Sequence, residues 1–222
     1  MAGPLPLQPL AQRHAWIRRM IGVPREPAAL DRGPVMDALR EIVDAAGGLE
    51  YARESLLRTV ELAQQEYDQL VILPHPPTWA GVHTPRVYYE FSNAVAWTRT
   101  VKDRIEDRLR PSVRADAALW DRLKDIRRNA AGPQLEDARL LAKCGLHKFT
   151  PPYANAPATV DNGVLLYPVV DRIVNAEDFR ANLTFNLGRH VVSVLEDYLA
   201  AVTRLVDGLL QVFYPPPAPP PV

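Results

Sequence analysis

The sequence lacks most of the features that would assign its class directly. It contains a single cysteine, Cys144, so no disulfide can form within the chain. It has no stretch of roughly 18 uninterrupted apolar residues, which a membrane-spanning helix requires. Its first residues do not combine a basic segment with a following apolar run, as a secretory signal does. These absences predict a protein of the reducing cytoplasm with no membrane association.

The chain also lacks net charge, because 26 lysines and arginines balance 26 aspartates and glutamates. Proteins that hold nucleic acid by bulk electrostatics carry a positive excess, so this balance argues against that class. The balance is not uniform, since the segment from Arg99 to Lys148 holds 13 basic and 8 acidic residues. This segment thus has a local excess of five positive charges, and the rest of the chain carries the compensating excess of acid.

What the sequence does have is apolar residues at helical spacing, within a composition that is 47% hydrophobic and typical of a globular protein. Apolar side chains spaced by threes and fours predict helical segments at 34–46, 49–72, 88–109, 112–131, 134–147 and 177–214. The breaks are placed at Gly47-Gly48, Pro111 and Gly132-Pro133, because glycine and proline disfavour a helix interior. Ser112 is expected to cap the helix that follows it.

Between the last two segments the pattern changes to that of strands. The residues Ala158–Val160 and Val164–Val170 predict two short strands around a tight turn. Asn162 and Gly163 supply the positive φ values that a type I′ hairpin needs. We therefore predict an all-α fold, a helical bundle of about five main helices, with a small β-hairpin at about 158–170 inserted before a long C-terminal helix.

The chain ends in a segment, 215–222, that is mostly proline and predicts polyproline II or disorder. Such a segment can also serve as a ligand for an aromatic-lined groove. The predicted organisation is a set of N-terminal helices (1–84) that pack on the bundle, a main helical domain (85–214) and this tail.

The residues best suited to catalysis or anion binding lie at the end of the predicted helix 134–147. Arg139, Lys143 and His147 are four residues apart and share one helix face. Cleavage of RNA without a metal needs a base for the 2′-hydroxyl proton and a cation for the phosphate, roles that histidine and lysine or arginine can fill. The simpler alternative is that cations and a histidine in a last turn favour the negative end of the helix dipole.

Other residues extend this hypothesis. Arg127, Arg128 and Lys148 are candidates for phosphate contacts, although basic residues at a predicted helix end are also explained by the dipole. The alternating charges of 102–108 are typical of a solvated face with ion pairs. In a functional version of that face, Asp103 or Glu90 would orient a catalytic base.

A metal site is the next alternative. Cys144 and His147 have the spacing of paired metal ligands, and His75 and His83 could complete a tetrahedral set. The paired spacing occurs only once, so a lone cysteine with two loop histidines is the favoured interpretation. We predict no metal and no cofactor.

The order of elements resembles the HEPN superfamily (higher eukaryote and prokaryote nucleotide-binding domains) over roughly 85–214. The resemblance is carried by the Tyr88–Leu109 helix, the Leu146–Lys148 element, the hairpin insert and the long final helix. It implies a small all-α domain that is usually dimeric. Many members are toxin or defence ribonucleases in which an arginine precedes a histidine by a short variable spacer.

The chain departs from that motif. The positions where the family's arginine would fall, Leu140 to Ala142, hold no arginine. Lys143 is one residue too close to His147 and Arg139 is one residue too far. The motif is therefore shifted or lost, and a degenerate member would be a binding or dimerisation module without catalysis.

Three functions follow as hypotheses. The first is a HEPN-like RNA-binding protein or metal-independent ribonuclease of a toxin–antitoxin or defence system. The second is a non-catalytic helical dimerisation or interaction protein, with a homo-oligomeric state and a small protein partner. The homo-oligomer is also predicted from extra apolar residues on the last helix, namely Val192, Val194, Leu199 and Val206. The third is a small-molecule pocket lined by Trp79, Trp97, Trp120 and Tyr153.

Overall fold

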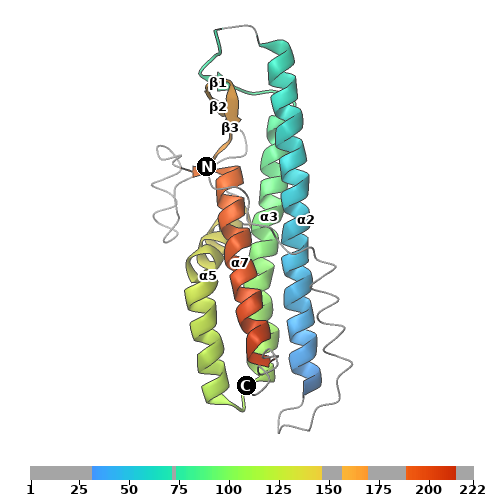
Figure 1. The fold of residues 1–222 in the computed structure, drawn as a ribbon, viewed down its shortest axis with the longest axis vertical. Coiled ribbons are helices and arrows are strands. Elements are labelled where there is room, and N and C mark those ends of the chain that lie inside the picture. The colour runs from blue at the N-terminus through green and yellow to red at the C-terminus, as the bar shows by residue number, and fades with distance from the viewer. Residues whose placement is uncertain (1–31, 72–73, 147–156, 170–188, 214–222) are drawn as a thin grey trace, which may run out of the picture.

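The computed structural model describes residues 32–71, 74–146, 157–169 and 189–213. In these ranges it has four long helices: α2 (Arg32–Leu70), α3 (Thr84–Arg104), α5 (Ala117–Leu146) and α7 (Val191–Phe213) (Figure 1). The predicted all-α class, with a small hairpin before the C-terminal helix, is confirmed. No helix within the described ranges has both the length and the apolar character needed to cross a bilayer.

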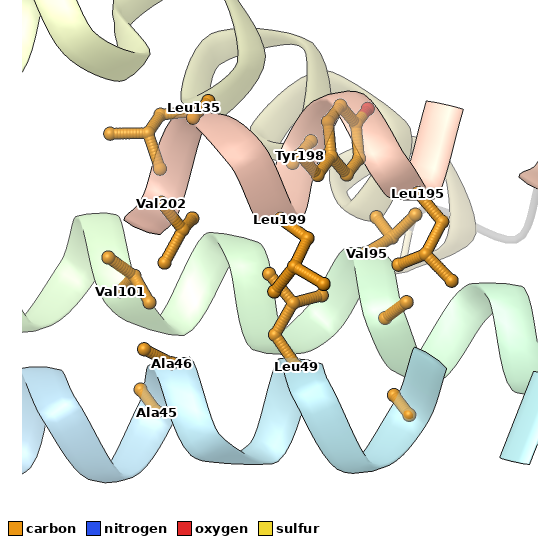
Figure 2. Packing of buried hydrophobic residues seen from close by; sticks show 14 of the residues in the cluster. Ala45, Ala46, Leu49, Val95, Val101, Leu135, Leu195, Tyr198, Leu199 and Val202 are labelled. Atoms are coloured by element: carbon orange, nitrogen blue, oxygen red, sulfur yellow. The ribbon is translucent and has the colours of Figure 1, made fainter. Parts of the chain in front are cut away.

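The helix α7 packs against all three of the other long helices, and α5 also packs directly against α3. Figure 2 shows side chains of α7, including Leu199 and Val202, directed toward α3 and α2. Of the four residues that predicted a partner surface, Val194, Leu199 and Val206 are buried inside this single chain, and Val192 is partly buried against the same core. The apolar width of α7 therefore supplies no argument for a dimer, and the oligomeric state stays a prediction.

The predicted break at Gly47-Gly48 is wrong, because α2 runs through it as one helix of 39 residues. Gly48 lies under the indole of Trp97 on α3, and a Cβ there would come within 2.4 Å of the ring. The glycine thus permits a close approach of two antiparallel helices rather than a stop. Burial of the neighbouring Ala46 and Leu49 offsets its helix penalty of about 1 kcal/mol.

The predicted end of the next helix at Pro111 is also wrong. The chain continues from α3 through a π-helical turn, η1 (Ile105–Leu109), into the short α4 (Arg110–Ser112). Pro111 lies in this continuous stretch directly after the π-helical turn, and the stretch ends one residue later at Ser112. Ser112 does not cap α5, since its hydroxyl donates to the Arg108 carbonyl at 2.7 Å. Asp116 is the cap, and its carboxylate accepts from the Leu119 N–H at 2.9 Å.

The third predicted break, at Gly132-Pro133, lies inside the continuous helix α5. A proline in a helix interior costs about 3 kcal/mol. Ala131 and Leu135 are buried on either side of it, and this apolar stripe holds the helix together. Two pairs of predicted segments are thereby merged, so the six predicted segments correspond to the four long helices of the described ranges.

The start of the last helix also differs from the prediction. Arg189 and His190 form a strand, β5, which pairs antiparallel with β4 (Pro168–Val169). The helix α7 therefore begins at Val191 and cannot continue back through β5. The predicted helical residues 177–188 lie outside the described ranges.

The hairpin prediction is confirmed. The strands β2 (Ala158–Asp161) and β3 (Val164–Leu166) pair antiparallel, and β1 (Thr78–Trp79) adds to β2. Asn162 and Gly163 have φ values of 50° and 80°. Gln64 of α2 fixes the hairpin, because its amide donates to the Gly163 carbonyl at 2.8 Å and accepts from the Leu165 N–H at 2.9 Å.

Candidate RNA-binding site

The residues predicted to handle RNA lie on or after α5. Arg127, Arg128 and Arg139 are on the described part of the helix, and Lys143 lies on its last turn. His147 and Lys148 follow the end of α5 and lie outside the described residues. The site can therefore be built from the helix upward as far as Arg139.

Arg139 is held by Glu136 one turn earlier on α5. Its Nε donates to the two carboxylate oxygens at 3.0 and 2.9 Å, and its Nη2 also contacts Glu136. The hydrogen bond from Arg139 holds the pKa of the Glu136 carboxyl below its usual value. The same bond raises the pKa of Arg139. The guanidinium is one-third exposed, so it is oriented by Glu136 and still reaches solvent.

Arg127 crosses from α5 to the π-helical turn η1. Its Nη1 donates to Glu106 Oε1 at 2.7 Å, and Lys102 Nζ lies 3.0 Å from the same oxygen. Burial raises the pKa of Glu106, but the hydrogen bonds and charges of Lys102 and Arg127 outweigh it and hold the pKa below its usual value. One carboxylate thus serves two cations from two helices.

These two groups belong together electrostatically. The charges of Lys102 and Arg127 also lower the pKa of Glu136, and the charge of Glu106 raises that of Arg139. We call Lys102, Glu106, Arg127, Glu136 and Arg139 the α3–α5 charge cluster. It contains three cations and two carboxylates, so it keeps one positive charge in excess. The sequence predicted ion pairs within 102–108, and Lys102–Glu106 is such a pair at helical spacing. Sequence reasoning missed the Arg127–Glu106 contact between helices and the role of Glu136.

Arg128 is separate from this cluster. Its only ion pair in the described ranges is with Asp125 on the same helix, at 3.6 Å, and its side chain is 73% exposed. The adjacent residues Arg127 and Arg128 therefore serve different faces of α5, and the structure does not bring all the predicted phosphate ligands to one place.

Asp137 is a second residue that sequence reasoning missed. It is 3% exposed and accepts from Arg189 of β5 at 2.7 and 3.3 Å and from the Tyr198 hydroxyl of α7 at 2.6 Å. This arrangement joins three elements through one buried carboxylate. Because Asp137 faces inward, Glu136 and Arg139 on the same turns face away from the core. The sequence carried no signal, since the partners are more than 50 residues away.

The alternative sites find less support. His75 Nδ1 is 2.7 Å from the Tyr67 hydroxyl, and no group of three potential metal ligands lies together within the described residues. The carboxylates proposed as orienting groups each pair with an arginine one turn earlier, Asp103 at 3.3 Å from Arg99 and Glu90 at 3.8 Å from Arg86.

The described tryptophans do not form a common pocket. Trp79 packs on Tyr67 near the end of α2, with ring centroids 5.5 Å apart. Trp97 covers Gly48, which lies about 28 Å along the same helix from Tyr67. Trp120 lies under the guanidinium of Arg110. This part of the small-molecule hypothesis is therefore wrong, and Tyr153 lies outside the described ranges.

No family model, curated protein or solved structure matches this chain. The fold and the site define the class as a helical-bundle protein with a cationic cluster across two of its helices.

Proposed function

We propose that this chain is a HEPN-like RNA-binding protein, acting in a toxin or defence setting, that contacts the RNA backbone at the α3–α5 charge cluster. The observation that carries the proposal is the excess of one positive charge among five side chains, which form two ion-paired groups close enough to shift one another's pKa values. The helix α5 leads from Arg139 to Lys143 and ends one residue before His147.

The cluster has the properties that a phosphate contact needs. Glu106 is shared between Lys102 and Arg127, so neither cation is fully neutralised. Arg139 is already oriented by Glu136, which reduces the conformational entropy lost when a phosphate binds. The neutral chain has little bulk attraction for RNA, so a few positioned cations are the appropriate means of recognition.

Cleavage is the catalytic extension of this proposal. His147 would take the 2′-hydroxyl proton, and Arg139 or Lys143 would stabilise the negative charge on the phosphate. Catalysis would be detected as cleavage of a labelled single-stranded RNA in the absence of metal ions. The substitution His147→Ala should abolish this cleavage and leave the fold intact.

A binding experiment tests the RNA contact itself. The Arg139→Ala/Lys143→Ala variant is compared with wild type in titrations of a labelled single-stranded RNA at several salt concentrations. Each lost phosphate contact should reduce the slope of log affinity against log salt by about 0.7. The matched control is Arg58→Ala/Arg114→Ala, which removes two exposed arginines outside the cluster. An unchanged affinity and slope in the test variant would contradict the proposal.

The second candidate function is a non-catalytic interaction protein. It is favoured by the pairing of Arg127 and Arg139 with carboxylates of the same chain, which is also how ion pairs stabilise a helix surface. If wild-type protein neither binds nor cleaves RNA, this candidate takes precedence.

A further inference from the structure

A groove lies between α5 and α7, on the flank of the bundle, separate from the α3–α5 charge cluster. It has a volume of about 620 Å³ and is lined by Arg122, Asp125, Ile126, Asn129, Ala130 and Arg204. Its α5 residues span about 12 Å, roughly two helical turns. Of the proposed RNA contacts that the structure describes with their side chains, Arg127 and Arg139, neither lines it.

The two helices approach closely at a glycine beside the groove. A Cβ at Gly208 of α7 would come within 2.7 Å of Ile126 Cγ2, so the two backbones are drawn together at this level. Ile126 and Ala130 give the groove an apolar surface, and polar side chains stand around them. Apolar residues between two helices with a charged rim are typical of grooves that accept an amphipathic helix.

The charges at the rim are not balanced. Arg122 of α5 and Arg204 of α7 have no carboxylate partner in the described part of the chain, and Arg204 donates only to the Ala130 carbonyl at 3.3 Å. Asp125 of the lining pairs with Arg128 outside it. Two guanidiniums that lack a carboxylate partner among the described residues thus stand on opposite walls, so the charge that complements this groove is negative.

The shape and the lining residues of the groove indicate which class of negatively charged ligand fits it best. Sites for small molecules enclose most of the ligand surface, whereas this groove is open to solvent. Single-stranded RNA is usually held by stacking its bases on aromatic rings, and no aromatic side chain from the described ranges lines the groove. An apolar surface flanked by arginines fits a protein segment with an apolar face and acidic flanks.

We propose that the α5–α7 groove is the docking site for an acidic amphipathic helix of a partner protein. Apolar side chains of the partner contact Ile126 and Ala130, and its carboxylates pair with Arg122 and Arg204. This proposal does not depend on the RNA-binding function, because it uses a different face of α5.

The test uses the full chain and two synthetic peptides of about 14 residues with the same leucine face at helical spacing. One peptide carries glutamates on the other positions and the second carries lysines. Wild type should bind the glutamate peptide, and Arg122→Glu/Arg204→Glu should weaken that binding by about tenfold or more while gaining affinity for the lysine peptide. The matched control Arg58→Glu, an exposed arginine on α2, should bind like wild type.

Several results would overturn the proposal: no binding of the glutamate peptide, equal binding of both peptides by wild type, or no change on charge reversal. Displacement of the peptide by single-stranded RNA, with RNA affinity lost in the same variant, would assign the groove to RNA. Circular dichroism checks the fold of the double variant. If it does not fold, the single substitution Arg122→Gln at an exposed position should still weaken binding of the glutamate peptide.

Discussion

At the scale of single residues, Asp137 has the strictest requirements of the side chains that the structure describes. A buried carboxylate is tolerated only when its hydrogen-bonding capacity is filled, and here Arg189 and Tyr198 contribute to filling it. Removing one partner of a buried ion pair leaves the other charge uncompensated. Substitution of Asp137 should therefore lower the free energy of unfolding far more than the loss of an exposed ion pair on the same helix.

We expect Asp137→Ala to destabilise the protein by about 3–5 kcal/mol, because it leaves the Arg189 charge without its carboxylate. Tyr198→Phe should cost about 1.5–3 kcal/mol, the value of a hydrogen bond to a charged group. Urea unfolding measures both. The control is Arg128→Ala, which breaks a solvent-exposed pair and should change stability by less than about 1 kcal/mol. An equal cost for Asp137→Ala and Arg128→Ala would show that Asp137 is not buried as described.

The charge cluster makes a prediction about acid stability. Glu106 and Glu136 have pKa values in the folded state below the ordinary value of 4.5. Their contribution to stability is therefore complete above pH 4.5 and is lost as the pH falls through the lower, folded-state values. Glu106→Gln/Glu136→Gln should show a shallower loss of stability below pH 4.5 than wild type in thermal unfolding across pH. A steeper loss in the variant would contradict the assigned sign.

At the scale of elements, the glycines and prolines show which features the sequence could predict and which it could not. The hairpin was predictable because Asn162 and Gly163 impose a local conformation that no distant contact needs to supply. The breaks at Gly48 and Pro133 were not, because packing against Trp97 and burial of Leu135 outweigh the local penalty. The candidate site follows the same rule, since its same-helix pairs were visible and the Arg127–Glu106 crossing was not.

The packing role of Gly48 can be measured directly. Alanine at an interior helix position normally gains up to about 1 kcal/mol over glycine. At Gly48 the new Cβ would overlap the Trp97 ring, so we expect Gly48→Ala to destabilise by about 1–3 kcal/mol in urea unfolding.

The control for this substitution is Gly132→Ala. The nearest atoms to a Cβ at Gly132 are 3.8 and 3.9 Å away, so no overlap occurs. Its propensity gain is opposed by the restriction on a residue that precedes proline, and we expect a change within about 1 kcal/mol. A stabilised Gly48→Ala variant would show that α2 and α3 do not approach as described.

At the scale of the whole molecule, one core includes residues from all four long helices, and α7 packs against α5, α3 and α2 (Figure 1). The wide apolar surface of α7, from which the sequence predicted self-association, is buried by packing within the chain. Association with other molecules must then rely on the outer faces of the bundle. Those faces include the cluster on α3 and α5 and the groove between α5 and α7.

The same arrangement predicts where the C-terminus can be shortened. Leu209 and Leu210 are buried near the end of α7, and the proline-rich segment follows soon after Phe213. Truncation after Tyr214 keeps every buried residue of α7, so the thermal midpoint should change by only about 2 °C or less. Truncation after Gly208 removes both leucines and should cost about 3–6 kcal/mol, from the loss of two fully buried side chains. Calorimetry of the two truncated proteins separates these outcomes. A large drop in the thermal midpoint of the protein that ends at Tyr214 would mean that the proline-rich segment contributes to the fold.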